Sequence, residues 1–272
     1  MIQLVDVRLD HPRGGDAPPL VTGANLELAA GEVVVVVGAA GVGTSRLVAA
    51  MLGEAAIAEG RIDVLGRDVG KLRRSSLRLL RRRVGIVPQD LCLLEDRSAQ
   101  LNVVLPLEID GIPRTISVAR AAECLARMGL EDEASLPVDC LSSSARQRVA
   151  VARALIRDPE LILADHPTSA QDAEGAERIC EAFYETASRG NSVIVFARDP
   201  AIRAIAERNR WRQLALIEGR LLPLGEVELE GRSIEEVLVG FESVPTPLHA
   251  VPDDLGPNLV PFPISARTAG AR

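Results

Sequence analysis

The chain has 272 residues and a hydrophobic content of 47%, which is enough to build a buried core for one large or two modest domains. Its formal net charge of −7 argues against a nucleic-acid partner, because neutralising phosphates requires a basic surface. No apolar run reaches the roughly 18 residues of a membrane span, and the first ten residues alternate like a strand instead of resembling a signal peptide. We therefore expect a soluble chain that stays in the cytoplasm.

In chain order, the hydrophobic pattern predicts alternating strands and helices, with a basic run at 71–83 (KLRRSSLRLLRRR) that we interpret as a solvated helix face with an apolar stripe. Two of the predicted strands, EVVVVVG and LILAD, are uninterrupted apolar runs, which is typical of strands buried on both faces of a parallel sheet. Strands are predicted at 2–9, 24–29, 32–38, 60–66, 83–89, 161–166, 192–199 and 213–222, and helices at 44–55, 115–128, 144–157, 172–189 and 200–208.

The pattern also predicts how the chain is divided. We expect one main domain over residues 1–222, in which helices with Pro and Gly turns form an insertion at about 90–157. A short extension at 223–242 contains one amphipathic helix (RSIEEVLVGF), and the proline-rich tail at 243–272 is predicted to be flexible or to lie on a surface.

The four cysteines are scattered, with no C-x-x-C pair and no neighbouring histidine cluster. This spacing suggests neither a disulfide framework nor a metal site. We interpret them as small buried or half-buried hydrophobic residues. They are Cys92, Cys124, Cys140 and Cys180.

A glycine-rich turn, GAAGVGTS at residues 38–45, follows the valine strand. It approaches the phosphate-loop pattern G-x-x-x-x-G-K-[ST]. It has both glycines, Gly38 and Gly43, and the final Ser45, but Thr44 occupies the lysine position. By itself this is a weak signal for phosphate binding.

The context strengthens that signal. About 120 residues later, the run PELILADHPTSAQD ends its apolar stretch in Asp165, in the manner of a magnesium-orienting aspartate at the carboxyl end of a sheet strand. The segment LSSSARQRVAVARAL at 141–155 lies immediately upstream.

These motifs, in this order, resemble those of the ATP-binding-cassette (ABC) nucleotide-binding subunits, especially the FtsE-, LolD- and MacB-like branch. The resemblance covers residues 1 to about 222 and includes EGRIDVLGRDV, RRRVGIVPQD, LLEDRSAQLNVVLPLEIDG, QRVAVARAL and ADHPTSAQD. It implies an α/β P-loop NTPase fold, with a RecA-like mixed sheet core, an antiparallel β subdomain and a helical insertion. It also implies ATP and Mg²⁺ as cofactors.

The resemblance implies roles for individual residues. Ser45, Gln89 and Asp165 would hold Mg²⁺, with Gln89 at the Q-loop position, while Asp172 closes the D-loop. His11 stands where the family has the aromatic residue that stacks on adenine. The implied nucleotide-binding residues are Gly38, Gly41, Gly43, Thr44, Ser45, Gln89, Asp165 and His11.

The chain departs from the family at the positions that carry the chemistry. Thr44 replaces the lysine that reaches the β- and γ-phosphates, His166 replaces the acidic residue that polarises the attacking water, and Arg198 replaces the switch histidine. The single lysine, Lys71, lies in the arginine-rich run, and Arg46 projects in another direction from its helix, so neither is a ready substitute for the lost cation.

The signature motif LSGGQ, which completes the site of the partner subunit in ABC dimers, is also changed. It reads Leu141-Ser142-Ser143-Ser144-Ala145, so Ser143 and Ser144 place side chains where glycines let the backbone approach phosphate. Ser142 is kept, which preserves one contact to the γ-phosphate. We therefore expect both the chain's own site and a partner's site to be impaired.

These departures favour a pseudo-ATPase. Each lost catalytic group is worth ~3 kcal/mol or more, roughly 10²–10³ in rate, whereas loop amides, Ser45 and Asp165 still allow weak binding of Mg²⁺ and ATP. We expect a peripheral scaffold at the inner face of the membrane. It would dock through a groove near residues 89–107 onto an FtsX-like or related permease subunit, as a homodimer or as a heterodimer with an intact ATPase.

Two alternatives stay open. The first is a slow but active ABC ATPase, whose catalytic groups are rebuilt from His166 and Arg198. The second is a nucleotide-sensing regulatory module, whose C-terminal segment at 223–272 recruits a partner.

Overall fold

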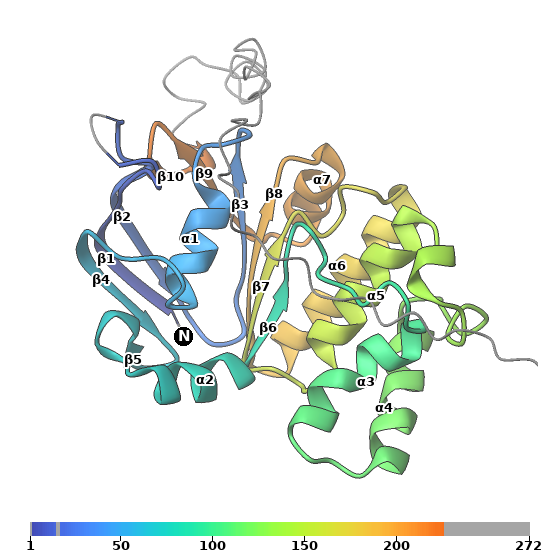
Figure 1. Cartoon of the computed structure of the whole chain (residues 1–272). Coiled ribbons are helices and arrows are strands. Elements are labelled where there is room, and N and C mark those ends of the chain that lie inside the picture. Colours follow the sequence, from blue (N-terminus) through green and yellow to red (C-terminus); the bar gives the residue numbers. More distant parts are fainter. Residues whose placement is uncertain (1, 15–16, 226–272) are drawn as a thin grey trace, which may run out of the picture.

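The computed structural model describes residues 2–14 and 17–225, so the helix expected at 232–241 and the proline-rich tail lie outside the described residues. Two sheets and a group of helices make up this part of the chain (Figure 1). No helix among the described residues is long and apolar enough to cross a membrane.

The central sheet has the strand order β10-β9-β3-β8-β7-β6. Strands β9, β3, β8, β7 and β6 are parallel to their neighbours, and only β10 pairs antiparallel with β9. Every residue of β3, β7 and β8 is buried, which confirms the prediction of strands covered on both faces. The strands are β3 (Val33–Gly38), β6 (Val84–Val87), β7 (Leu161–Asp165), β8 (Ser192–Ala197), β9 (Arg212–Ile217) and β10 (Arg220–Pro223).

The valine run of β3 supplies two cores at once, because successive side chains of a strand point to opposite faces. Val33, Val35 and Val37 join the cluster formed with the helices of the insertion and with α6 and α7. Val34 and Val36 join the cluster formed with helix α1 and the second sheet. The sheet therefore holds the two halves of the molecule together.

The second sheet is antiparallel, in the order β2-β1-β4-β5, and confirms the predicted β subdomain. Helix α1 packs between it and the central sheet, with Leu47 and Met51 fully buried. The elements are β1 (Ile2–Leu9), β2 (Val21–Leu28), α1 (Thr44–Met51), β4 (Glu59–Val64), β5 (Arg67–Asp68) and the short 3-10 helix η1 (Val69–Lys71).

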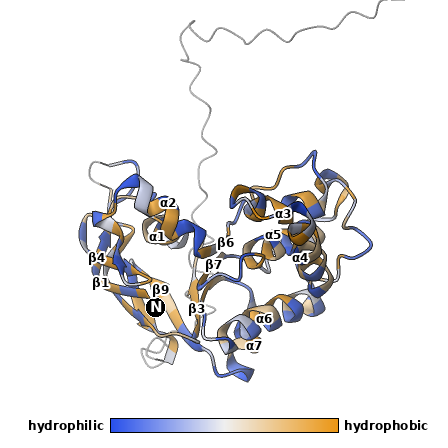
Figure 2. Ribbon diagram, turned by 90° about the horizontal axis from the view of Figure 1, so that it is seen from below, coloured by the Kyte–Doolittle hydropathy of each residue, from blue (hydrophilic) through white to orange (hydrophobic). Residues whose placement is uncertain are grey.

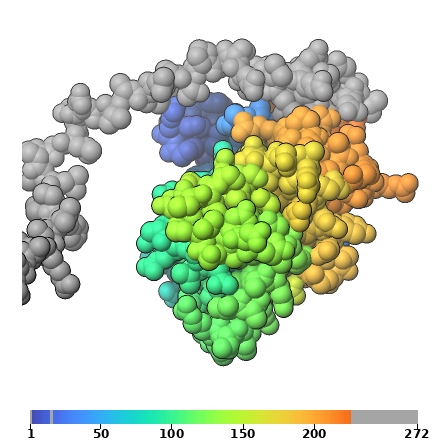
Figure 3. All heavy atoms as spheres, turned by 90° about the vertical axis from the view of Figure 1, so that its right-hand side faces the viewer, coloured from blue at the N-terminus to red at the C-terminus, as the bar shows by residue number. Residues whose placement is uncertain are grey.

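Helices α3, α4 and α5 pack on one another beside β6 and β7, on the side away from β1 and β4 (Figure 2). Figure 3 shows this insertion, in green to yellow-green, gathered on one face of the molecule. The helices are α2 (Arg74–Arg82), α3 (Ala99–Ile109), α4 (Arg114–Arg127), η2 (Val138–Cys140), α5 (Ser143–Leu155), α6 (Ala173–Ser188) and α7 (Pro200–Arg208).

Two expectations about local structure need correction. The segment predicted as one strand at 213–222 is the hairpin β9–β10, which turns at Glu218 and Gly219, because apolar residues continue on both sides of a two-residue turn. Two cysteines, Cys92 and Cys140, are exposed instead of buried, since they lie at or beside loops. Cys180 is buried in α6, and burial raises the pKa of its thiol to about 12.

Helix α6 offers a test of the core that uses neighbouring residues. Phe183 is fully buried, whereas Tyr184 is 54% exposed. We expect Phe183→Ala to lower the free energy of unfolding by about 3–5 kcal/mol through lost burial and a cavity, and Tyr184→Ala by less than about 0.5 kcal/mol. Urea denaturation measures both changes, and similar losses for the two variants would contradict the described packing.

Candidate nucleotide site

The carboxyl ends of β3 and β7 meet at one edge of the central sheet. The phosphate-loop segment follows β3 and leads into α1, while Asp165 is the last residue of β7. The hydroxyl of Ser45 donates a hydrogen bond of 2.6 Å to Oδ2 of Asp165, although the two residues are 120 positions apart. The structure thus brings together two of the residues that the sequence selected for a magnesium site.

The loop before α1 depends on two glycines. Gly41 and Gly43 have φ angles of +77° and +112°, a left-handed region that favours glycine. A side chain on Gly43 would also lie 3.1 Å from Cβ of Leu20. The loop therefore makes a tight turn directly before α1, whose first hydrogen bond runs from the amide of Leu47 to the carbonyl of Gly43. The N-terminus of a helix attracts anions.

Thr44 gives this loop no charge. Its side chain is buried, and its methyl carbon Cγ2 lies 3.4 Å from the position that a side chain on Gly38 would occupy. The single lysine does not compensate, because Lys71 is exposed and pairs with Asp68 at 2.8 Å. Arg46 has a buried Nε with no hydrogen-bond partner among the described residues.

The oxygen atoms beside the loop fit a magnesium ion. Oδ1 of Asp165 is buried without a hydrogen-bond partner in the described part of the chain, and Oδ2 lies 2.6 Å from the Ser45 hydroxyl. Adjacent ligands of an octahedral Mg²⁺ are separated by roughly 3 Å. A small movement would therefore let the Ser45 oxygen and Oδ2 of Asp165 bind the same ion. Gln89 lines a pocket that also includes Ser45 and Asp165, and its role as a magnesium ligand stays a prediction.

His166 and Arg198 lie beside this centre. The amide of His166 donates to the carbonyl of Phe196 at 2.8 Å, and Arg198 is the first residue after β8. The imidazole is buried, with Nε2 at 3.7 Å from Oδ1 of Asp165. Burial lowers the pKa of His166, Asp165 opposes that shift, and the charge of Arg198 adds to it. The ring is therefore neutral at pH 7.

The signature segment is bonded to the loop that follows β7. The hydroxyl of Ser144 donates to Oε1 of Gln171 at 2.9 Å, and the Gln171 amide donates to the Ser144 carbonyl and to Oε1 of Gln147. Gln147 in turn donates to the carbonyl of His166 at 2.8 Å. Sequence reasoning missed Gln171 and Gln147, because no spacing rule relates these positions and only the fold brings them together.

Other predicted site residues have local roles in this structure. Ser142 and Asp172 cap helices α5 and α6, accepting hydrogen bonds from the amides of Ala145 and Gly175. Ser143 is the exposed first residue of α5. His11 lies in the loop after β1, where its Nδ1 accepts from the amide of Arg13 at 3.1 Å, and its contact with adenine stays a prediction.

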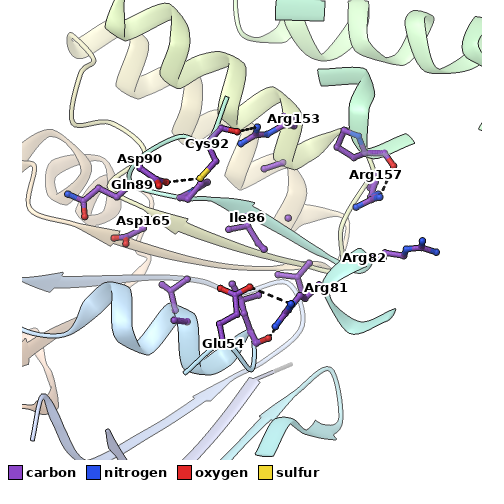
Figure 4. Close-up of a pocket in the computed structure, with 18 of the residues that line it drawn as sticks. Glu54, Arg81, Arg82, Ile86, Gln89, Asp90, Cys92, Arg153, Arg157 and Asp165 are labelled. Carbon is purple, nitrogen blue, oxygen red and sulfur yellow. Dashed lines mark hydrogen bonds and ion pairs between the residues drawn. The ribbon is translucent and has the colours of Figure 1, made fainter. Parts of the chain in front are cut away.

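A groove of about 1050 Å³ runs from this centre between α1 and α2 on one side and α3 and α5 on the other (Figure 4). We call it the lateral groove. Gln89, Asp90 and Asp165 lie toward one end, and Arg82 and Arg157 toward the other. Its lining residues are Ser45, Val48, Ala49, Leu52, Glu54, Arg78, Arg81, Arg82, Val84, Gly85, Ile86, Pro88, Gln89, Asp90, Cys92, Pro106, Ile109, Arg153, Ala154, Arg157 and Asp165.

Known proteins share this sequence pattern. A family model described as ABC transporter matches residues 21–169, more than half of the chain. The macrolide export ATP-binding/permease protein MacB of Escherichia coli (strain K12) is 36% identical over 209 residues, which cover 76% of this chain and 32% of MacB. MacB of Shigella sonnei (strain Ss046) gives the same values. The chain therefore spans about a third of the length of these curated relatives.

Solved structures share the fold. The dimeric post-hydrolysis structure of the ATP-binding cassette MJ0796, bound to ADP and Pi, has a TM-score of 0.74 and 29% identity over 81% of this chain and 96% of its own. The structure of cbiO1 from Clostridium perfringens, at 22% identity, supports the fold alone, with a TM-score of 0.70 over 89% of this chain and 98% of its own. These similarities confirm the predicted P-loop fold, and the chain belongs to the ABC transporter family as an ATP-binding cassette.

Proposed function

We propose that this cassette is a pseudo-ATPase that acts as the cytoplasmic scaffold of a membrane complex, docked on an FtsX-like or related permease subunit. The observation that carries this proposal is the chemistry around the Ser45–Asp165 pair. The buried Thr44 supplies no cation, and the residue after Asp165 is a buried, neutral His166 instead of a carboxylate.

The expected loss of rate is large. Phosphoryl transfer depends on positioned charges that stabilise the transition state. Removing one such group typically reduces the rate by roughly 10²–10³, and two losses together by about 10⁴ or more. His166 is a poor replacement base, because its ring is only 8% exposed and burial lowers its pKa.

Weak nucleotide binding is compatible with the same site. The glycine loop and the start of α1 attract phosphate without a lysine. Ser45 and Oδ1 of Asp165, which has no hydrogen-bond partner among the described residues, would hold Mg²⁺. We therefore propose that ATP binds weakly and is hydrolysed little or not at all.

The signature segment supports an altered dimer. Ser143 is exposed at the start of α5, where a second cassette would approach in a family-type dimer. The Ser144 hydroxyl is committed to Gln171 of its own chain. We propose that the partner cassette, a second copy or an intact ATPase, also receives an incomplete site from this subunit.

The lateral groove supports the scaffold role. It lies between the sheet core and the helices of the insertion, and it includes part of the segment 89–107 that the sequence selected for docking. As its name states, MacB combines an ATP-binding part and a permease part in one protein. We propose that this cassette contacts its permease through this groove, from a main domain at 1–222 with its helical part at about 90–157.

Measurement of ATP turnover tests the loss of catalysis. We expect the full chain with Mg²⁺ and ATP to turn over about 10⁴-fold or more below an intact cassette, through two losses of roughly 10²–10³ each. The double substitution Thr44→Lys with His166→Glu should raise the rate, because it returns a cation and a carboxylate. The matched variant Thr44→Lys with His166→Gln returns only the cation and should gain less.

An opposite result is equally clear. Magnesium-dependent turnover by the unmodified chain that disappears in Asp165→Ala would show an active ATPase built on His166 and Arg198. Binding of a non-hydrolysable ATP analogue without turnover agrees with the proposal. Affinity purification from native membranes then tests the scaffold role, and repeated failure to recover any membrane subunit would count against it.

The buried His166 also predicts a dependence of stability on pH. Its folded pKa lies below the ordinary value of 6.5, so the unfolded chain takes up the proton first as the pH falls. The stabilisation is complete above pH 6.5 and decreases below it, by at most about 1.4 kcal/mol per pH unit for one proton.

The substitution His166→Asn isolates this effect, because asparagine tolerates the left-handed backbone at this position, where φ is +53°. Urea denaturation at pH 7.5 and pH 5.5 should show a smaller loss of stability for the variant than for the unmodified chain. Equal losses in the two proteins would exclude His166 as the source.

A further inference from the structure

The lateral groove combines an apolar surface with a concentration of arginines. Val48, Ala49 and Leu52 line it from the α1 side, and Ile86 of β6 lies between the two walls. Ile109, at the end of α3, is 60% exposed. Such a surface is suited to aliphatic side chains of an inserted segment.

Among the described residues that line the groove, the charged side chains are five arginines and three carboxylates. One carboxylate, Asp165, belongs to the magnesium end. The remaining surface is therefore basic, in a protein whose formal net charge is −7. The charged residues are Arg78, Arg81, Arg82, Arg153, Arg157, Glu54, Asp90 and Asp165.

Among the described residues, these arginines do not each have a carboxylate partner of their own. Asp110 forms ion pairs with two of them, Arg157 at 2.6 Å and Arg82 at 3.4 Å. Arg78 is exposed and has no ion pair or hydrogen bond among the described residues. The groove therefore has at least one guanidinium group with all of its donors available.

Arg153 adds positive charge deeper in the groove. Its guanidinium donates to the main-chain carbonyls of Leu91 and Cys92 and, within the described part of the chain, to no carboxylate. Burial lowers the pKa of Arg153, but a guanidinium stays charged at neutral pH. A low-dielectric wall around a fixed positive charge strengthens the attraction for a negative group.

We propose that the segment of the membrane subunit that enters the lateral groove is acidic, with aliphatic side chains over Ile86 and Ile109 and carboxylates facing Arg78 and Arg82. A guanidinium has five donors and no acceptor, so its partner must supply acceptors, and carboxylate oxygens match its geometry. The inference rests on the proposed scaffold function and adds the chemistry of the partner.

The position of the charges favours an inserted segment over a lipid surface. Arg157 has a side chain 20% exposed and Arg153 is held against loop carbonyls, so both lie inside the groove. A flat anionic membrane would contact the outer arginines of α2 and leave Ile109 and the inner arginines uncovered. A protein segment with one apolar face and one acidic face contacts all of them.

A peptide titration against the full chain tests the proposal. The probe is a designed amphipathic helix with leucines on one face and glutamates beside them. Two matched peptides carry glutamine or lysine in place of glutamate. Fluorescence anisotropy should show that the glutamate peptide binds the full chain with at least about tenfold higher affinity than either of the other two peptides. This difference in affinity should decrease as salt is added.

Arg78→Glu should weaken the glutamate peptide by about tenfold. The matched control is Arg120→Glu, on the exposed face of α4 outside the groove, which changes the net charge equally and should have no effect. Equal affinity for the three peptides, or equal effects of the two variants, would overturn the proposal. So would binding to anionic phospholipid vesicles that depends on Arg78 while the glutamate peptide fails to bind.

The two proposals fail in different ways. Recovery of a membrane subunit without ATP turnover, together with no preference for the acidic peptide, refutes only the acidic partner. Acidic-peptide binding that depends on Arg78, together with magnesium-dependent turnover abolished by Asp165→Ala, refutes only the pseudo-ATPase.

Discussion

The contact between Ser45 and Asp165 is the point on which the site depends. It requires the loop after β3 and the end of β7 to lie at the same edge of the sheet, with β8 between the two strands. That arrangement requires strands with both faces covered. The valines of β3 meet this requirement because alternate side chains pack into the two hydrophobic cores on opposite faces of the sheet. The fold therefore keeps the Ser45–Asp165 pair in place, with Thr44 and His166 next to it in the sequence.

The sequence was sufficient wherever one physical rule determined the result. Uninterrupted apolar runs identified β3 and β7, and the rule that parallel strands share a carboxyl edge placed Asp165 beside the loop. The sequence was insufficient where the apolar residues showed no helical or strand periodicity. Helix α3 was not assigned its own range, because its side chains are apolar on all sides and Pro106 interrupts the pattern.

Side-chain hydrogen bonds between distant elements were beyond sequence reasoning. Ser144 could be recognised only as a departure from glycine, and its bond to Gln171 joins positions 27 residues apart. The charge of the lateral groove could not be predicted for the same reason. Its arginines come from α2, from α5 and from the segment just after α5, and they become neighbours only when the insertion packs beside β6. Composition alone, with a net charge of −7, predicts an acidic surface instead of a basic groove.

Gln147 has a consequence for any ligand that reaches Asp165. Its amide donates to the His166 carbonyl and the Ser169 hydroxyl, and its oxygen accepts from Ala170 and Gln171, which uses its full hydrogen-bonding capacity. One side chain thus fixes the shape of the loop after β7 through contacts within the protein. Because this loop is already ordered, it loses little conformational entropy when a ligand binds next to it.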